Sequence, residues 1–151
     1  GQVVITYTVP GPLSDIFSVS IREGAAQPGT LVACGEFEAR DRLVLPLGPV
    51  GGSTVVGKAE LRTEGNMVRI ELVAYGVQNG TSYFSGAFNS TSQNCTGGLI
   101  GSYAAPVTAE NGQVLIGYNV PGPIQNIAAV SVNQGAQTPG TVVACGRFTN
   151  R

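Results

Sequence analysis

The chain has 151 residues, of which 42% are hydrophobic and only 11% are charged. Eight Lys and Arg residues against nine Asp and Glu residues give a net charge of −1, which excludes a basic surface for nucleic-acid phosphates or anionic lipids. Histidine is absent, so the usual general base and commonest metal ligand are missing. We therefore expect no nucleic-acid partner and no cofactor.

The chain ends and apolar runs also limit the interpretation. No apolar run reaches the roughly 18–20 residues that a membrane-spanning helix needs. The first residue is Gly, and no signal peptide is visible. We expect a processed product or a slice of a longer polypeptide.

The first 40 residues carry two β-strand signals. Residues 3–8 are β-branched or aromatic at almost every position, and residues 31–34 form a short apolar run. Between them, Pro10, Gly11 and Pro12 predict a turn, because proline cannot lie inside a central strand.

Residues 43–75 contain the densest strand signals. Apolar and polar residues alternate in residues 67–75, which puts Val68, Ile70 and Leu72 on one face and Arg69 on the other. That pattern is typical of an antiparallel strand with one dry face and one wet face. The expected strands of this stretch are residues 43–47, 54–56, 58–62 and 67–75, with a turn at 63–66.

The last third of the chain alternates predicted loops and strands. We expect loops at 76–98 and 104–112 and strands at 114–118 and 142–145. No 11-residue window predicts an amphipathic helix. Many short strands punctuated by 22 Gly and 9 Pro predict an all-β sandwich or barrel.

A long internal repeat organises the chain. Residues 112–151 match residues 1–40 at an offset of 111 without gaps, and 23 of the 40 aligned positions are identical. Shared β composition could explain matching Val and Ile, but it does not explain VPGP, PGT and VACG in register. A period of this length is that of a domain, far above the roughly 20–50 residues of solenoid repeats.

The repeat predicts the domain boundaries and a tandem-repeat architecture. Residues 41–151 should form a complete β-sandwich repeat, and residues 1–40 should be the C-terminal half of a preceding one. Taken alone, residues 1–40 would offer about three strands with one uncovered apolar face, and such a fragment has marginal stability. The first 40 residues therefore need a partner that completes them.

The repeat also orders the three cysteines. Cys34 and Cys145 occupy the same repeat position, which leaves Cys95 as the earlier cysteine of the complete repeat. We expect a Cys95–Cys145 disulfide, with three buried free thiols as the alternative. Cys34 is then unpaired, or is joined to the Cys95 equivalent of a neighbouring domain.

Several segments resemble the copper–zinc superoxide dismutases. The sequence FSGAFNSTSQNC from Phe84 to Cys95 resembles that family's stretch with a His-x-His pair and its first disulfide cysteine. VACGRF from Val143 to Phe148 resembles its C-terminal strand with the second cysteine, and residues 43–61 resemble its first two strands. The extracellular CHRD domain resembles this chain about as well. The resemblance implies a Greek-key antiparallel β-sandwich, immunoglobulin-like in architecture, with a disulfide.

The departures from that family decide what the resemblance implies for function. The His-x-His positions fall on Phe84 and Gly86, and the later copper-ligand strand corresponds to residues 129–133, also without histidine. The resemblance therefore implies the sandwich without a metal site and without dismutase activity.

Other candidate chemistry is sparse. Asp41 beside Arg40 and Arg42 is interpreted as a surface ion cluster, and Glu23 is replaced by Gln134 in the second copy. Paired carboxylates for glycoside hydrolysis stay open as an alternative to solvated charges. A nucleophilic triad has no histidine base, and the chain has a single lysine. We expect no enzyme.

Three N-glycosylation sequons fall on the predicted loops. Asn79, Asn89 and Asn94 each begin an Asn-x-Ser/Thr triplet. The alternative is a Ser/Thr/Asn-rich loop that yields sequons by chance. Asn94 is the weakest candidate, because its neighbour is the predicted disulfide cysteine.

Two functions remain in view. The first is a secreted or cell-surface structural subunit of a filament, sheath or surface layer, whose partners are copies of itself or adjacent repeats. The second is an adhesin or ligand-binding module that uses loops 76–98 and 104–112. Four aromatic residues near those loops could line a binding patch, although packing in the core is favoured: Tyr83, Phe84, Phe88 and Tyr103.

Overall fold

The computed structural model describes residues 6, 8, 18–24, 29–36 and 42–148. The chain divides into two compact units, Gly1–Ala39 and Arg40–Asn150, and each is described by itself. The predicted turn at 10–12 and the ion cluster around Asp41 lie outside the described residues, as does most of the predicted strand at 3–8. Thr6 and Thr8, which are described, are not in a strand.

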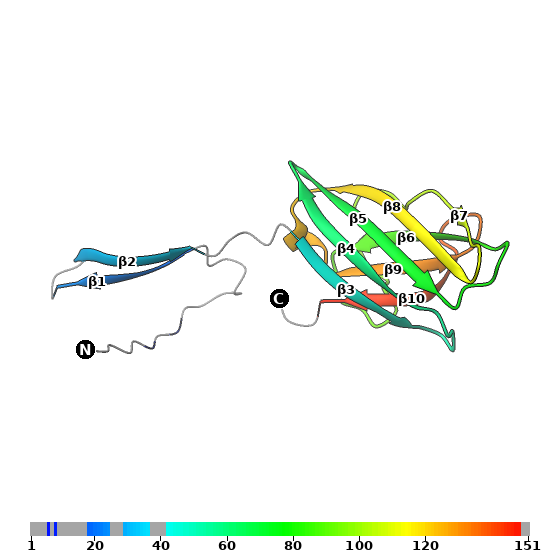
Figure 1. Cartoon of the computed structure of the whole chain (residues 1–151), viewed down its shortest axis with the longest axis horizontal. Coiled ribbons are helices and arrows are strands. Elements are labelled where there is room, and N and C mark those ends of the chain that lie inside the picture. Colours follow the sequence, from blue (N-terminus) through cyan, green and yellow to red (C-terminus); the bar gives the residue numbers. More distant parts are fainter. Residues whose placement is uncertain (1–5, 7, 9–17, 25–28, 37–41, 149–151) are drawn as a thin grey trace. The chain divides into compact units, whose positions relative to one another are not determined.

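All regular strands are antiparallel (Figure 1). The first unit contains a hairpin of β1 (Ser18–Glu23) and β2 (Thr30–Glu36). The second contains β3 (Arg42–Pro49), β4 (Val56–Glu64), β5 (Met67–Tyr75), β6 (Ser82–Phe88), β7 (Val107–Thr108), β8 (Gln113–Pro121), the 3-10 turn η2 (Ile124–Asn126), β9 (Ala129–Gln134) and β10 (Thr141–Arg147). No helix among the described residues is long and apolar enough to cross a membrane.

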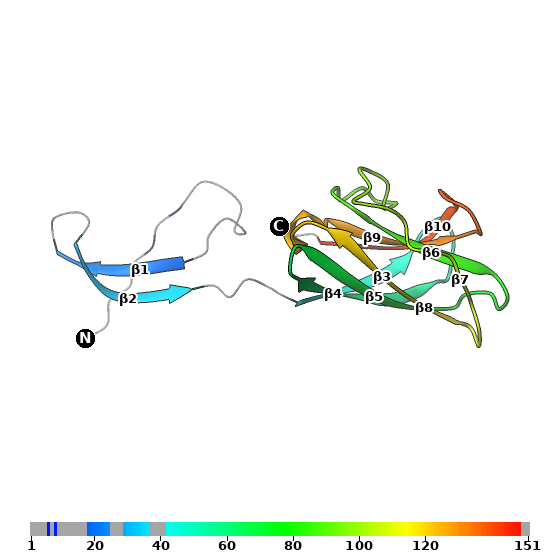
Figure 2. The same ribbon diagram turned by 90° about the horizontal axis from the view of Figure 1, so that it is seen from above.

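The eight strands of the second unit form one curled sheet. Their order is β7-β6-β9-β10-β3-β4-β5-β8, and β8 comes close to β6 and β7, so the sheet nearly closes into a barrel. Figure 2 shows β4, β5 and β8 in one layer and β6 and β9 in the other. The join between layers is short, because β10 pairs with β3 only at Ala144–Pro49 and Cys145–Gly48.

The β4–β5 hairpin shows how the sequence sets the local structure. Gly65 has φ 63° in the two-residue turn between Glu64 and Met67, a conformation that favours glycine. In β5, Val68 and Ile70 are buried while Glu71 is exposed. The predicted alternation of dry and wet faces is confirmed.

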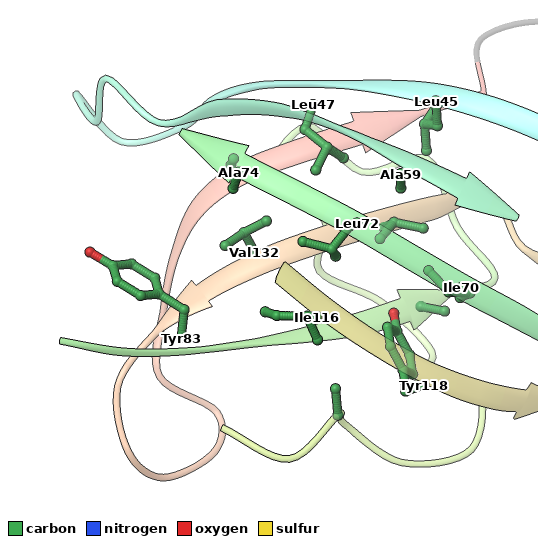
Figure 3. Packing of buried hydrophobic residues seen from close by; sticks show 14 of the residues in the cluster. Leu45, Leu47, Ala59, Ile70, Leu72, Ala74, Tyr83, Ile116, Tyr118 and Val132 are labelled. Atoms are coloured by element: carbon green, nitrogen blue, oxygen red, sulfur yellow. The ribbon is translucent and has the colours of Figure 1, made fainter. Parts of the chain in front are cut away.

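The main core lies between the two layers. Figure 3 shows Leu72 of β5, Ile116 of β8 and Val132 of β9 meeting there. A second, smaller cluster lies on the opposite face of β6, β9 and β10, because successive strand residues point to opposite faces. Its buried members are Phe88, Cys95, Ala129 and Cys145, and Val50, Leu99 and Tyr103 pack against them.

Three sequence predictions about this unit need correction. Residues 54–56 are not a separate strand, because β4 begins at Val56 and pairs with β3 and β5. The predicted loop 76–98 contains the buried strand β6, and the predicted loop 104–112 contains β7. Gly, Ser and Ala weaken the β-propensity of Ser82–Phe88, and burial on both faces replaces the alternation that would have revealed the strand.

Candidate functional site

The disulfide ties a long loop to the last strand. Cys95 and Cys145 are bonded with their Cα atoms 5.6 Å apart, as predicted. Cys95 is buried and adopts φ 49° in a turn where its N–H donates to the Ser92 carbonyl. The bond holds residues 89–106 against the outer face of β6, β9 and β10.

Aromatic packing fixes the same loop at a second point. The rings of Phe84 and Tyr103 lie 5.3 Å apart at an interplanar angle of 87°. Gly86 leaves room for this contact, since a Cβ there would lie 2.7 Å from Tyr103 Cε1. Three of the four predicted aromatic candidates are buried, and the fourth is partly buried, so they pack in the protein and form no open patch: Tyr83, Phe84, Phe88 and Tyr103.

Two polar residues of β9 are buried under this cover. The Ser131 hydroxyl donates to Asn133 Oδ1 and accepts from the Gly86 N–H at 3.3 Å. Asn133 Nδ2 donates to the Pro139 carbonyl at 2.9 Å. Both side chains are therefore satisfied without charge. Such pairing is what makes their burial tolerable.

The inner face has a separate buried polar pair. The hydroxyls of Ser85 and Tyr118 lie 2.9 Å apart between the layers. Burial raises the pKa of Tyr118 far above its usual value, and the hydrogen bond between its hydroxyl and that of Ser85 only partly opposes the shift. The phenol stays neutral and serves packing.

The positions that correspond to the His-x-His pair of the superoxide dismutases carry no metal-binding side chain. Phe84 and Gly86 lie inside the packed face just described. Across the described residues, no group of three His, Cys, Asp or Glu residues could hold a metal ion.

Carboxylates gather on the exposed outer face of β4 and β5. Glu60 and Glu71 are cross-strand neighbours, and Glu60 accepts from Arg42 at 2.6 Å and from Arg62 at 2.5 Å. The hydrogen bond from Arg42, followed by that from Arg62, lowers the pKa of Glu60. Glu71 pairs with Arg69 at 3.4 Å. Both carboxylates are thus ion-paired with arginines on an exposed strand face.

The sequon asparagines are all exposed on loops. Asn79 Oδ1 accepts from the Gly112 N–H at 2.6 Å, which joins the turn at 76–81 to the turn at 109–112. Asn89 and Asn94 lie beyond the other end of β6. The predicted loop 76–98 therefore begins beside residues 109–112 of the other predicted loop, whereas its last part, residues 89–98, lies at the opposite end of the seven-residue strand β6, roughly 20 Å away.

The hairpin of the first unit repeats the hairpin of β9 and β10 in three dimensions. Ser18 pairs with Glu36 and Ile21 with Ala33. At the offset of 111 these correspond to the observed pairs Ala129–Arg147 and Val132–Ala144. All six residue pairs of one hairpin match those of the other, and the register shift falls at the same place.

The two hairpins differ in what covers them. In the second unit β9 pairs with β6 and β10 pairs with β3. Val132 and Val143 face the main core there and are 0% and 7% exposed. Among the described residues of the first unit, β1 and β2 pair only with each other, and the equivalent Ile21 and Val32 are 46% and 54% exposed. Cys34, the equivalent of Cys145, is free and exposed.

We call the pair of strands β1 and β2 the open hairpin. Ser20, Arg22 and Cys34 lie on one of its two faces. Arg22 stands where the second unit has the buried Asn133, and its Nη1 donates to the Gly29 carbonyl at 3.2 Å. Sequence reasoning missed this exchange, although the offset of 111 alone aligns Arg22 with Asn133.

Comparison with known proteins adds no assignment: no family model matches the chain, and no curated protein matches it.

Proposed function

We propose that the protein is a non-enzymatic structural subunit of an extracellular assembly, a filament, sheath or surface layer, built of tandem β-sandwich repeats. Neighbouring domains or subunits complete one another's sheets in this assembly. The observation that carries the proposal is the open hairpin: β1 and β2 pair in the register of β9 and β10 but leave their apolar residues exposed.

The energetics of the open hairpin favour completion. An isolated two-stranded sheet is marginal in water, and strands with free edges pair readily with added strands. Ile21, Leu31 and Val32 are each about half exposed. Burying the exposed half of each of these three side chains supplies about 1 kcal/mol each before ordering costs.

A Greek-key sandwich is the fold that we propose for each repeat. β3, β4 and β5 follow one another as hairpins, whereas β5 to β6 and β8 to β9 connect strands that are not neighbours in the sheet. This order supports Greek-key connectivity. The resemblance of Cys145 and its neighbours to the superoxide dismutase family points the same way.

The extracellular location rests on covalent chemistry. The Cys95–Cys145 disulfide is of a kind that persists in oxidising compartments and is rare in reducing ones. The exposed sequons at Asn79 and Asn89 lie on loops, where glycans can be carried.

Stoichiometry shapes the assembly. The sequence contains two copies of the hairpin segment and one copy of residues 41–111. Closed exchange among identical chains would leave one hairpin uncovered in each. We therefore propose completion by a repeat of different sequence, in the same or another polypeptide.

Electron microscopy of the native material tests the proposal. Ordered polymers with a repeat of domain size are the expected result. Dispersed single particles at high concentration, with the intact protein at native mass and with native termini, would contradict it.

A further inference from the structure

We propose that the open hairpin is a selective docking site for a cysteine-bearing strand segment that carries a carboxylate facing Arg22. The occupant is a counterpart of residues 41–111 from a repeat of different sequence. This inference rests on the proposed function only for the idea that another segment completes the hairpin. What it adds is the chemistry that chooses the segment.

The second unit shows which contacts such an occupant makes. β6 covers the free edge of β9, and β3 covers the outer edge of β10. Cys95, in the loop after β6, bonds to Cys145. Because the open hairpin keeps the same register, its β1 edge faces a β6-like strand and Cys34 faces the cysteine of the covering loop.

Glycine at one shared position supports a β3-like neighbour as well. A Cβ on Gly146 would lie 2.7 Å from the Pro46 carbonyl oxygen and 2.7 Å from Leu47 Cδ2. The close approach of β3 therefore requires glycine there. Gly35 occupies the same position of the open hairpin, so a strand can approach it equally closely.

Arg22 sets the selectivity. Asn133, at the equivalent position, is 2% exposed and is satisfied by neutral hydrogen bonds. A guanidinium at that depth needs a carboxylate, because a buried charge without a partner is strongly destabilising. Glu23 cannot supply one, since adjacent strand residues point to opposite faces.

The chain's own residues 76–109 cannot supply the carboxylate either. That stretch holds β6, the disulfide loop and β7, and it contains no Asp or Glu. A second copy of this chain would therefore bury Arg22 without a partner. The absence of Asp and Glu from residues 76–109 disfavours exchange between identical chains, and it favours an occupant with an acidic residue opposite Arg22, where β6 has Phe84 across from Asn133.

The disulfide between Cys34 and the occupant's cysteine forms by a two-electron oxidation of the two thiols. The Cys34 thiolate attacks a small disulfide such as oxidised glutathione, forming a mixed disulfide and releasing one glutathione thiolate. The occupant's cysteine thiolate then attacks the Cys34 sulfur and releases the second. Two thiols become one disulfide, and their protons and electrons leave on two glutathione thiols.

A fusion protein tests the site with the full chain. Gly1 aligns with Gly112, so placing residues 41–111 before Gly1 reproduces the natural junction between 111 and 112. Three forms are compared in glutathione redox buffer: the unchanged fusion, the fusion with Arg22→Asn, and the fusion with Phe84→Glu in the added segment. Peptide mapping after thiol alkylation measures the ratio of bonded to free Cys34.

The proposal predicts an ordered result. Cys34 stays mostly free in the unchanged fusion, and Arg22→Asn raises the bonded-to-free ratio roughly a hundredfold. Phe84→Glu raises the ratio with Arg22 in place. Equal bonding in the unchanged fusion and in the Arg22→Asn fusion would overturn the selectivity, and free Cys34 in every form would overturn the docking site.

A negative result for the docking site can be distinguished from a negative result for the proposed assembly. The fusion reports on the open hairpin whether or not polymers exist. If Phe84→Glu leaves the bonded-to-free ratio of Cys34 unchanged or lowers it, the role of the carboxylate is overturned. The existence of the assembly is tested separately, by electron microscopy.

Discussion

The hairpins β1–β2 and β9–β10 share one pairing pattern and have opposite surroundings. Their residues pair in the same register with the bulge in the same place, so local sequence suffices to set the pairing. Burial is different: Val132 is fully buried, whereas its equivalent Ile21 is about half exposed. The pairing belongs to the hairpin, and the burial of Val132 is supplied by the opposite layer, where it meets Leu72 of β5 and Ile116 of β8.

The hairpins differ in charge at three positions, because Asn133, Gln134 and Arg147 correspond to Arg22, Glu23 and Glu36. A neutral pair at the end of β9 thus becomes a charged pair at the end of β1. Because every position of one hairpin has a counterpart in the other, each substitution has its control at the offset of 111.

Removing the disulfide should have the largest effect. Replacing both Cys95 and Cys145 by Ala frees a loop with a sequence separation of 50 residues, which costs about 4 kcal/mol in the chain-entropy model. Urea unfolding of the second unit measures the loss. Cys34→Ser should leave the same transition unchanged. An equal loss in both variants would contradict the conclusion that Cys145 is disulfide-bonded and Cys34 is free.

Placing a charge at the buried position should have the next effect. Asn133→Arg puts a guanidinium under the covering loop without a carboxylate and should lower the free energy of unfolding by about 3 kcal/mol. Arg22→Asn, the reverse change in the open hairpin, should leave urea unfolding unaltered. An unchanged free energy of unfolding in Asn133→Arg would mean that an arginine reaches solvent from this position. It would contradict the claim that Arg22 needs a carboxylate in its occupant.

Much of the second unit can be predicted from its sequence. The alternation of apolar residues with Arg69 and Glu71 predicts β5 with its bounds and its dry face. The same reasoning misses β6 as a strand, because Tyr83 to Phe88 are all buried and show no alternation. The cover of β6 comes from segments distant in sequence, which periodicity cannot reveal.

The candidate site is predictable only through the repeat. The offset of 111 pairs Cys95 with Cys145 and leaves Cys34 open, and the disulfide is present. The burial of Asn133 could not be predicted, because Ser131 and Asn133 look like solvent-facing residues of a half-buried strand. They are hidden by contacts outside their own strand: Ser131 accepts from the Gly86 N–H of β6, and Asn133 lies across from Phe84 and donates to the Pro139 carbonyl.

A methyl group on the shared glycine should have a moderate effect. In Gly146→Ala the new Cβ would meet the Pro46 carbonyl oxygen at 2.7 Å, and overpacking of this kind costs about 2 kcal/mol. Gly35→Ala should cost nothing measurable, because β2 pairs only with β1 among the described strands. Thermal unfolding of the two variants, measured side by side, gives the comparison.

The buried serine should have the smallest effect of the series. Ser131→Ala removes the hydroxyl that accepts from the Gly86 N–H and donates to Asn133 Oδ1, at a cost of about 1 kcal/mol. Ser20→Ala should be silent in this chain, because Ser20 is exposed. In the fusion with Arg22→Asn, however, Ser20 gains the same cover, and Ser20→Ala should then cost as much as Ser131→Ala in urea unfolding. A Ser20→Ala variant that stays silent there would show that the completed hairpin does not reproduce the packing of β9.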